Sequence, residues 1–264
     1  MLQTYSNSQL KEREKQLEQQ FKVACDAGLS LDITRGKPAP EQLDLAADLL
    51  SLPGSDQFHD DHGTDCRNYG GIDGLAGMKA LFAAILGCET RDIIVGGTSS
   101  LTMMYDSVVR ATLFGVPGGD QPWGQQGTIR FLCPAPGYDR HFEITGHLGF
   151  ELLSVDMTDE GPDMDRVETL AADPSVKGIW CVPRYSNPTG ITYSETVARR
   201  LARMSAAPDF RIFWDNAYAE HHLTENHQPV PDILSECRDA GNADRVLMFA
   251  STSKMTMAGA GVAA

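Results

Sequence analysis

The chain has 264 residues, of which 42% are hydrophobic, and its 36 acidic residues outnumber its 22 basic ones. This length allows one or two domains with a large core, and the net charge of −14 argues against nucleic acid as a partner. No signal-peptide core, membrane-length apolar run or zinc-ligand cysteine pair is present, so we expect a cytoplasmic protein with reduced thiols and no membrane contact.

The N-terminal segment is predicted to contain a charged amphipathic helix over residues 8–27, which ends at Gly28. A loop of glycine and prolines follows around Gly36, with a basic residue on each side of this glycine. That basic pair suits either an anion or a solvated loop. A second helix is expected over residues 41–50.

The next segment, residues 51–66, is polar and irregular, and it contains an H-x-x-H pair formed by His59 and His62. A metal site needs further ligands and none is obvious, so we predict no metal centre. The glycine-rich turn of residues 67–74 then opens a helix that is apolar on one side and ends at Gly87. This turn lacks the spacing of a P-loop and follows no clear strand, which also disfavours a dinucleotide site.

A strand predicted over residues 91–95 leads into the small-residue turn 96–100 and a helix that reaches about Phe114. The free amides in the first turn of such a helix, together with its dipole, favour an anion. The same pattern also suits an ordinary strand-to-helix turn with a serine or threonine cap. The turn is therefore predicted to be either a phosphate seat or a capped helix start.

Strands and helices alternate from here to the end of the chain. The expected strands cover residues 129–133, 151–155, 178–182, 211–215 and 246–250, and the expected helices cover residues 139–146, 164–172 and 194–204. Strands that are apolar on both faces and separated by helices indicate an α/β fold, in which helices cover both faces of a mostly parallel sheet.

Three of the predicted strands end in polar motifs. These are Pro183-Arg-Tyr-Ser-Asn-Pro-Thr-Gly190, Asp215-Asn-Ala-Tyr218 and Ser251-Thr-Ser-Lys254. Ligands bind at the carboxyl ends of the strands in open α/β sheets, so we expect the three motifs to converge there. A lysine desolvated at that edge loses its proton readily and becomes a nucleophile. Taken singly, the motifs also suit a turn, a helix cap and a surface lysine.

In this order, the motifs resemble those of the aspartate aminotransferase superfamily, the fold-type I enzymes that use pyridoxal 5'-phosphate. The finer resemblance is to a MocR-like bacterial aspartate aminotransferase subgroup, through Thr34-Arg-Gly-Lys-Pro, Gly-Gly-Thr-Ser-Ser-Leu, Tyr-Ser-Asn-Pro-Thr-Gly and Ser-Thr-Ser-Lys-x-x-x-Ala-Gly-Ala-Gly. The likeness covers residues 36–261. It implies an N-terminal arm and small-domain segment over residues 1–50 and a cofactor-binding large domain over residues 51–264.

The resemblance assigns the catalytic chemistry to a small set of side chains. Lys254 would form the internal aldimine with the cofactor and, once freed, move the Cα proton of the amino acid. Asp215 would pair with the protonated pyridine nitrogen and keep the ring an electron sink. Asn187 and Tyr218 would bind the 3-hydroxyl oxygen, and the ring of Tyr138 would stack on the cofactor.

The resemblance also implies how phosphate, partner subunit and substrate are contacted. The phosphate contacts would be Thr98, Ser99, Ser251 and the backbone of Gly97. Tyr69 is similar to the tyrosine that reaches the phosphate of the neighbouring subunit, which implies a homodimer with shared active sites. The substrate contacts would be Gly36 and Asn187.

Two features depart from the family pattern. Val262 occupies the position, eight residues after the lysine, where many relatives carry a phosphate-binding arginine. The chain also ends ten residues past Lys254, without the C-terminal small domain that supplies the arginine for the substrate carboxylate. We therefore interpret the chain as a truncated enzyme and expect an unpaired sheet edge.

The resulting prediction is a pyridoxal phosphate-dependent aminotransferase that moves an amino group from an amino acid, with aspartate favoured, to a 2-oxo acid such as 2-oxoglutarate. The same scaffold also serves β-lyases and decarboxylases, because the cofactor supplies the electron sink in all of them. A non-catalytic module that only holds the cofactor is another alternative, and it would need fewer of these side chains. A plain nucleotide-binding domain ranks last, since no matching phosphate fingerprint is present.

Overall fold

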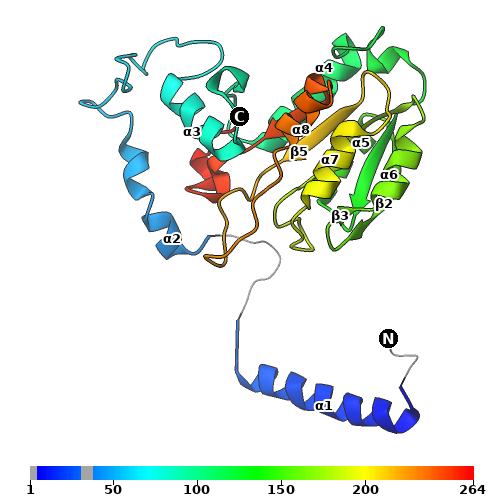
Figure 1. Cartoon of the computed structure of the whole chain (residues 1–264). Helices are drawn as coiled ribbons and strands as arrows, with labels where there is room; N and C mark the ends of the chain where they lie inside the picture. The colour runs from blue at the N-terminus through cyan, green and yellow to red at the C-terminus, as the bar shows by residue number, and fades with distance from the viewer. Residues whose placement is uncertain (1–4, 31–37) are drawn as a thin grey trace. The chain divides into compact units, whose positions relative to one another are not determined.

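The computed structural model describes residues 5–30 and 38–264, and the chain divides into two units, Met1–Ala39 and Pro40–Ala264. The first unit holds helix α1 (Asn7–Asp26), drawn in blue in Figure 1. Ser6 begins it with a capping box, in which its side chain accepts from the Gln9 amide and its own amide donates to the Gln9 side chain. The predicted helix over residues 8–27 is therefore confirmed, whereas Gly36 lies outside the described residues.

The second unit is built on a six-stranded sheet (Figure 1). The strands are β1 (Arg130–Ala135), β2 (Glu151–Thr158), β3 (Gly161–Pro162), β4 (Val176–Cys181), β5 (Arg211–Asp215) and β6 (Val246–Phe249). Their order in space is β3-β2-β1-β4-β5-β6, and every neighbouring pair is parallel except β2 with β3. The mostly parallel sheet predicted from the sequence is confirmed.

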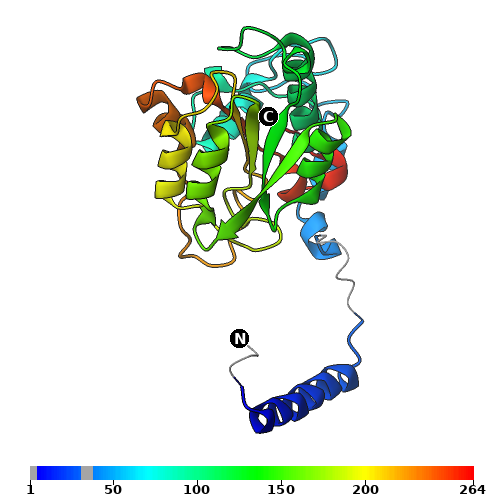
Figure 2. The ribbon, with the colours of Figure 1, turned by 90° about the vertical axis from the view of Figure 1, so that its right-hand side faces the viewer.

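The helices of this unit are α2 (Pro40–Asp44), α3 (Ala76–Leu86), α4 (Ser100–Phe114), α5 (Asp139–His147), α6 (Met164–Ala171), α7 (Glu195–Arg203) and α8 (Ile233–Asp239). Of these, α4 and α5 lie on one face of the sheet and α6, α7 and α8 on the other (Figure 2). None of the helices in the described part of the chain is long and apolar enough to cross a membrane.

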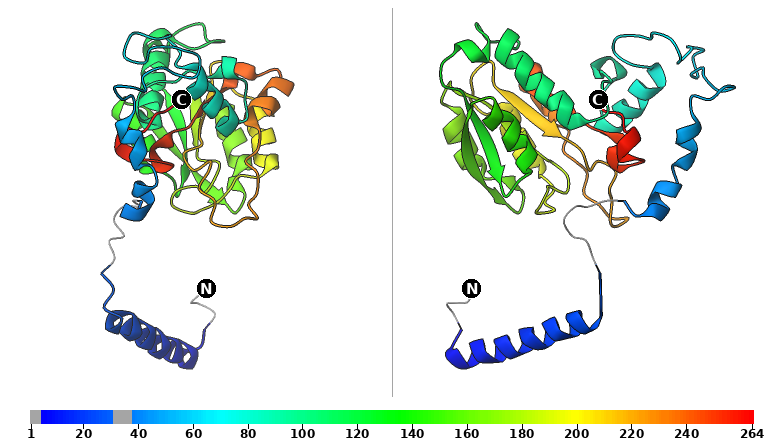
Figure 3. Two further views of the ribbon diagram at one scale, coloured as in Figure 1. Left: turned by 90° about the vertical axis from the view of Figure 1, so that its left-hand side faces the viewer. Right: turned by 180° about the vertical axis from the view of Figure 1, so that it is seen from behind.

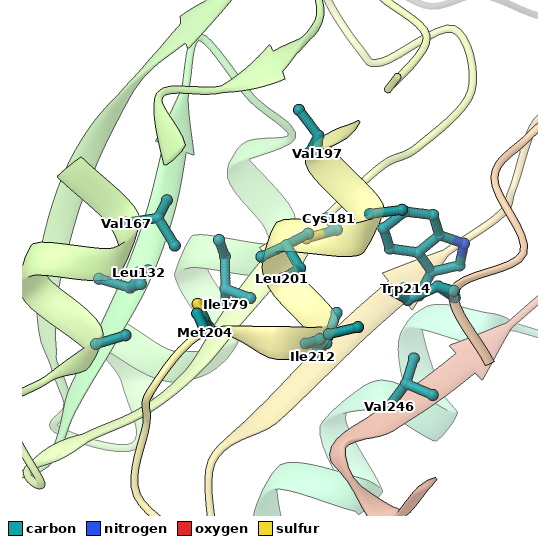
Figure 4. Close-up of a cluster of buried hydrophobic side chains, with 14 of the residues drawn as sticks. Leu132, Val167, Ile179, Cys181, Val197, Leu201, Met204, Ile212, Trp214 and Val246 are labelled. Atoms are coloured by element: carbon teal, nitrogen blue, oxygen red, sulfur yellow. The ribbon is translucent and has the colours of Figure 1, made fainter. Parts of the chain in front are cut away.

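Alternate residues of the central strands pack on opposite faces of the sheet, as the pleat requires. On one face, Ile179 and Ile212 pack with residues of α6, α7 and α8, including the fully buried Leu201 (Figure 4). On the other face, the neighbouring residues Trp180 and Phe213 pack with α4, α5 and the buried Phe131. Burial of each large apolar side chain stabilises the fold by about 1.5–3 kcal/mol, which makes this sheet a rigid support for the loops at its edge.

A third, smaller cluster joins the last residues of the chain to α3. Ala250, just after β6, exchanges two backbone hydrogen bonds with Ala264, and both residues pack with Phe82 of α3. Figure 3 shows this C-terminal segment beside α3. Within the described residues β6 is the terminal strand and pairs with β5 alone, as the predicted unpaired edge requires, while the residues just after β6 pair with the last residues of the chain.

Two predicted elements are wrong in detail. Residues 91–95 form no strand; a 3-10 turn (Thr90–Asp92) is followed by an extended segment in which the Val95 amide donates to Asp73 and the Gly96 amide to Ala263. The helix expected over residues 41–50 divides into α2 and a 3-10 helix (Ala47–Ser51). Neither piece contains a buried residue, so no packing stabilises a continuous helix.

Candidate active site

A cavity of about 160 Å³ lies at the carboxyl ends of β4, β5 and β6, where the sequence predicted that three motifs converge. Its walls come from Ser99, Ser100, Leu101, Tyr138, Val182, Asn187, Asp215, Ala217, Tyr218, Ser251, Ser253 and Lys254. The convergence is therefore confirmed. A larger open groove of about 810 Å³ between α4, α5 and β2 gathers none of the three motifs.

Asp215 is the last residue of β5, and its side chain is almost completely buried. One carboxylate oxygen, Oδ2, lies 2.9 Å from Nε2 of His141. The other oxygen, Oδ1, is buried and has no hydrogen-bond partner among the described residues. A buried carboxylate oxygen without a donor is costly, so this arrangement favours a ligand that brings an N–H group.

His141 was missed by the sequence analysis, although it fixes the carboxylate of Asp215. It lies in the first turn of α5, fully buried, with its ring stacked on Trp180 at 4.8 Å and edge-on to Tyr138 at 5.0 Å. Because an ionised carboxylate only accepts, Nε2 of His141 carries the proton of this hydrogen bond. A histidine in the first helical turn after the end of β1 was the available signal.

Lys254 ends a 3-10 turn (Thr252–Lys254) that follows β6. Its Nζ donates to the hydroxyl of Tyr218 at 3.0 Å and lies 4.3 Å from the centre of that ring. The sequence predicted a desolvated lysine, and this prediction is wrong, because Lys254 is exposed in the described chain. The apolar residues of β6 bury the strand but not the side chain that follows it.

Serine hydroxyls line the cavity beside the lysine. The Oγ atoms of Ser251 and Ser253 are 2.7 Å apart, and Ser253 Oγ also donates to the carbonyl of Thr98 at 3.3 Å. Gly261 packs against them so closely that a Cβ there would lie 2.4 Å from Ser253 Oγ. The absence of a side chain at this glycine therefore keeps the serine in place.

The N-terminus of α4 borders the same cavity as this hydroxyl cluster. Ser99 precedes the helix, but its side chain makes no capping hydrogen bond, and both Ser99 and Ser100 line the cavity. The first amides of a helix have no partner within the helix, and its dipole favours negative charge. Of the two interpretations left open by the sequence, the anion seat fits this geometry better than the capped helix start.

Tyr138 and Asn187 also line the cavity. Burial raises the pKa of the Tyr138 phenol, so its hydroxyl stays protonated at neutral pH. Asn187 comes two residues after Tyr185, which has a positive φ of 48°, unusual for a residue with a side chain. Such backbone conformations are frequent at functional sites.

The remaining predicted site residues are not among those that line this cavity, or they lie outside the described residues. Thr98 is exposed, and Gly97 beside it adopts a positive φ of 66°. Tyr69 is fully exposed, whereas nothing is described for Gly36. No cluster of metal-binding side chains occurs within residues 5–30 and 38–264, and the His59–His62 pair belongs to none.

Val262 stands at the position where many relatives were expected to carry a phosphate-binding arginine. Its amide donates to Thr252 Oγ1 at 3.0 Å, and its side chain packs with the cluster around α3. Lys254 is the one cationic side chain that lines the cavity within the described ranges. The serine hydroxyls are therefore neutral donors, and Lys254 is the cationic group beside them.

Comparison with known proteins places these features in context. The family model described as aspartate amino-transferase matches residues 5–264. A protein named aspartate aminotransferase from Corynebacterium glutamicum is 49% identical over 247 residues, which are 93% of this chain and 57% of that protein. A protein from Mycolicibacterium smegmatis, named provisionally as an aminotransferase, is 56% identical over 238 residues, which are 89% of this chain and 56% of that protein.

Solved structures agree with the sequence comparison. The crystal structure of an aspartate transaminase from Corynebacterium glutamicum has a TM-score of 0.89 at 47% identity, over 99% of this chain and 62% of that one. An α-aminoadipate aminotransferase from Thermus thermophilus, complexed with N-(5'-phosphopyridoxyl)-L-leucine, has a TM-score of 0.62 at 21% identity, which shows likeness of fold alone. The chain spans little more than half the length of the curated relatives that it matches.

Proposed function

We propose a function from one premise, which is that this chain belongs to the aspartate aminotransferase family. The protein as a whole is proposed to be a pyridoxal 5'-phosphate-dependent transaminase that takes the amino group of aspartate and transfers it to a 2-oxo acid such as 2-oxoglutarate. The name of the Corynebacterium glutamicum relative supports aspartate as the donor. The activity is proposed for the whole protein, because this chain spans only 57% of that relative.

One observation carries the proposal. The buried Oδ1 of Asp215 has no partner in the described chain, and Asp215 lines the same cavity as Lys254. A protonated pyridine nitrogen is a cationic N–H donor of the kind that a buried carboxylate oxygen requires. His141 already holds the other oxygen, so the carboxylate is oriented before the cofactor binds. The residues of the cavity therefore fit pyridoxal phosphate.

The cofactor, when bound, would supply an electron sink for the negative charge that develops on the substrate Cα. Lys254 would hold the cofactor covalently, and its Nζ would later move the proton at the substrate Cα. The Tyr218 hydroxyl, 3.0 Å from Nζ, orients this amine. Asn187 would join Tyr218 in binding the 3-hydroxyl oxygen, and Tyr138 would cover the ring, since all three line the cavity.

The phosphate is proposed to bind at the hydroxyl cluster and the N-terminus of α4. Ser99, Ser100, Ser251 and Ser253 would donate to its oxygens, with the first amides of the helix. Neutral donors and the helix dipole would then do what an arginine does in relatives that carry one at the position of Val262. The predicted contacts of Thr98 and of the Gly97 backbone stay proposals beside this set.

Homodimer formation stays part of the proposal. Tyr69, whose ring is fully exposed, would reach the phosphate of the neighbouring subunit. Gly36 would contact substrate together with Asn187. The first contact needs a second subunit, and the second needs Gly36, which lies outside the described residues.

The test is amino transfer by the purified protein supplied with pyridoxal phosphate. With aspartate and 2-oxoglutarate we expect oxaloacetate and glutamate in equal amounts, and no product from the variant Lys254→Ala. Lys79→Ala is the matched control, because Lys79 pairs with Asp73 outside the cavity. Release of ammonia or carbon dioxide instead would indicate a β-lyase or a decarboxylase. Binding of the cofactor without any turnover would contradict the proposal and favour a binding module.

A further inference from the structure

The turn after β5 contacts Lys254 twice, once at the side-chain amine and once at the backbone oxygen. Tyr218 accepts a hydrogen bond from Nζ at 3.0 Å, and Nε2 of His221 lies 2.6 Å from the backbone oxygen of Lys254. The His221 amide in turn donates to the Tyr218 carbonyl at 3.2 Å, and the two rings meet edge-on at 5.9 Å. Phenol and imidazole are therefore held in one short turn, at a fixed spacing from each other.

The backbone oxygen of Lys254 needs a donor from outside its own turn. Lys254 is the last residue of the 3-10 turn, and the next two amides, of Met255 and Thr256, both donate to Thr252. The carbonyl groups at the end of a helical turn have no partner within it. Because a carbonyl oxygen only accepts, the His221 ring must donate through Nε2, and His221 thus satisfies the orphan group.

The other ring nitrogen of His221 shows that the ring is seated in the protein. Nδ1 is buried and has no partner among the described residues. A buried ring nitrogen without a partner is unfavourable, and the ring could relieve this by turning toward water. The hydrogen bond at Nε2 opposes that rotation. The contact with Lys254 is therefore the interaction that determines the orientation of this side chain.

We propose that His221 is a positioning residue for Lys254, which fixes the backbone of the cofactor-bearing lysine while Tyr218 fixes its amine. This inference rests on the proposed role of Lys254. Two hydrogen bonds from one turn leave the lysine little freedom, although its side chain is exposed and no core packing holds it. His221 itself touches no reacting atom.

The experiment compares three substitutions of His221 with a control in the same loop. His221→Gln keeps a donor near the position of Nε2, whereas His221→Asn places its donor near Nδ1 and His221→Ala removes it. His222→Ala is the control, because His222 contacts Arg184 and Tyr185 and not Lys254. The affinity for pyridoxal phosphate is measured by absorbance, and hydrogen exchange of residues 251–257 is measured without cofactor.

We expect His221→Ala and His221→Asn to weaken cofactor affinity about tenfold, the value of one hydrogen bond, and to speed exchange in residues 251–257. His221→Gln should restore most of both effects, and His222→Ala should leave exchange in that segment unchanged. Equal effects of His221→Ala and His222→Ala, or no effect of His221→Ala, would overturn the inference. The exchange measurement needs no cofactor, so failure of the wild-type protein to bind pyridoxal phosphate would count against the proposed function alone.

Discussion

Replacing Asp215 by asparagine should separate stability from cofactor binding. The substitution removes a buried negative charge whose Oδ1 has no partner, while an asparagine oxygen still accepts from His141. An unsatisfied buried charged group costs more than the ~1–3 kcal/mol of a neutral one. We therefore expect the cofactor-free variant to be at least as stable as the wild type, with a gain of up to about 1 kcal/mol, since the asparagine NH₂ group still lacks an acceptor.

Cofactor binding should change in the opposite direction. The variant loses a charge-assisted hydrogen bond to the pyridine nitrogen, which is worth about 1.5–3 kcal/mol, or roughly 10- to 150-fold in affinity. Denaturant unfolding without cofactor measures the first effect, and an absorbance titration with pyridoxal phosphate measures the second.

Asp209 provides the matched control for this experiment. It is equally buried, but both of its oxygens are paired, Oδ1 with Lys177 at 2.7 Å and Oδ2 with Gln126 at 2.9 Å. Asp209→Asn leaves the buried ammonium of Lys177 without its charge partner and should destabilise the fold by about 3–5 kcal/mol. If Asp215→Asn destabilised the cofactor-free protein as much as Asp209→Asn does, the reasoning about the unpaired oxygen would be refuted.

Three further predictions follow from the same structure. Gly261→Ala should lower cofactor affinity about tenfold, because its Cβ would displace Ser253, whereas Gly259→Ala points into open space and should not; equal titrations would contradict this. Arg184→Ala should cost about 3 kcal/mol in denaturant unfolding, since Arg184 donates to the carbonyls of Ala219 and Gln228 at 2.7 and 2.9 Å, while the exposed Arg166→Ala should change stability by less than about 0.5 kcal/mol. Burial raises the pKa of Cys133 to about 12, above its ordinary value of 9.0, so its contribution to stability is complete below pH 9.0 and declines as the pH rises from there toward 12. In the folded protein at neutral pH, iodoacetamide should label the exposed Cys25 and spare Cys133, and labelling of both at equal rates would contradict the burial.

The sheet was predictable because its signal is local. The predicted strand 211–215 coincides with β5, all of whose residues are buried, and continuous apolar runs of this kind identify strands covered on both faces. The cavity was predictable for a related reason, since the motifs that contain Asn187, Asp215 and Lys254 each begin at or just after the end of a strand. Parallel strands bring their ends to one edge, so spacing along the chain does not matter there.

Other features depend on contacts that no local pattern encodes. His141 and Asp215 are 74 residues apart in sequence, so their hydrogen bond could not be inferred from either motif. The segment predicted as a strand over residues 91–95 has the right residues, but its hydrogen bonds go to Asp73 and Ala263 and form no ladder. The exposure of Lys254 was missed because an apolar strand says nothing about what covers the side chain that follows it.

The most direct test of the central claim is chemical trapping of the lysine. The protein is incubated with pyridoxal phosphate, reduced with borohydride, digested and mapped by mass spectrometry. The account predicts a phosphopyridoxyl group on Lys254 and not on Lys79 or Lys177, with less labelling in the Asp215→Asn variant at limiting cofactor. Labelling spread evenly over the lysines, or absent from Lys254, would contradict the claim that Lys254 holds the cofactor opposite Asp215.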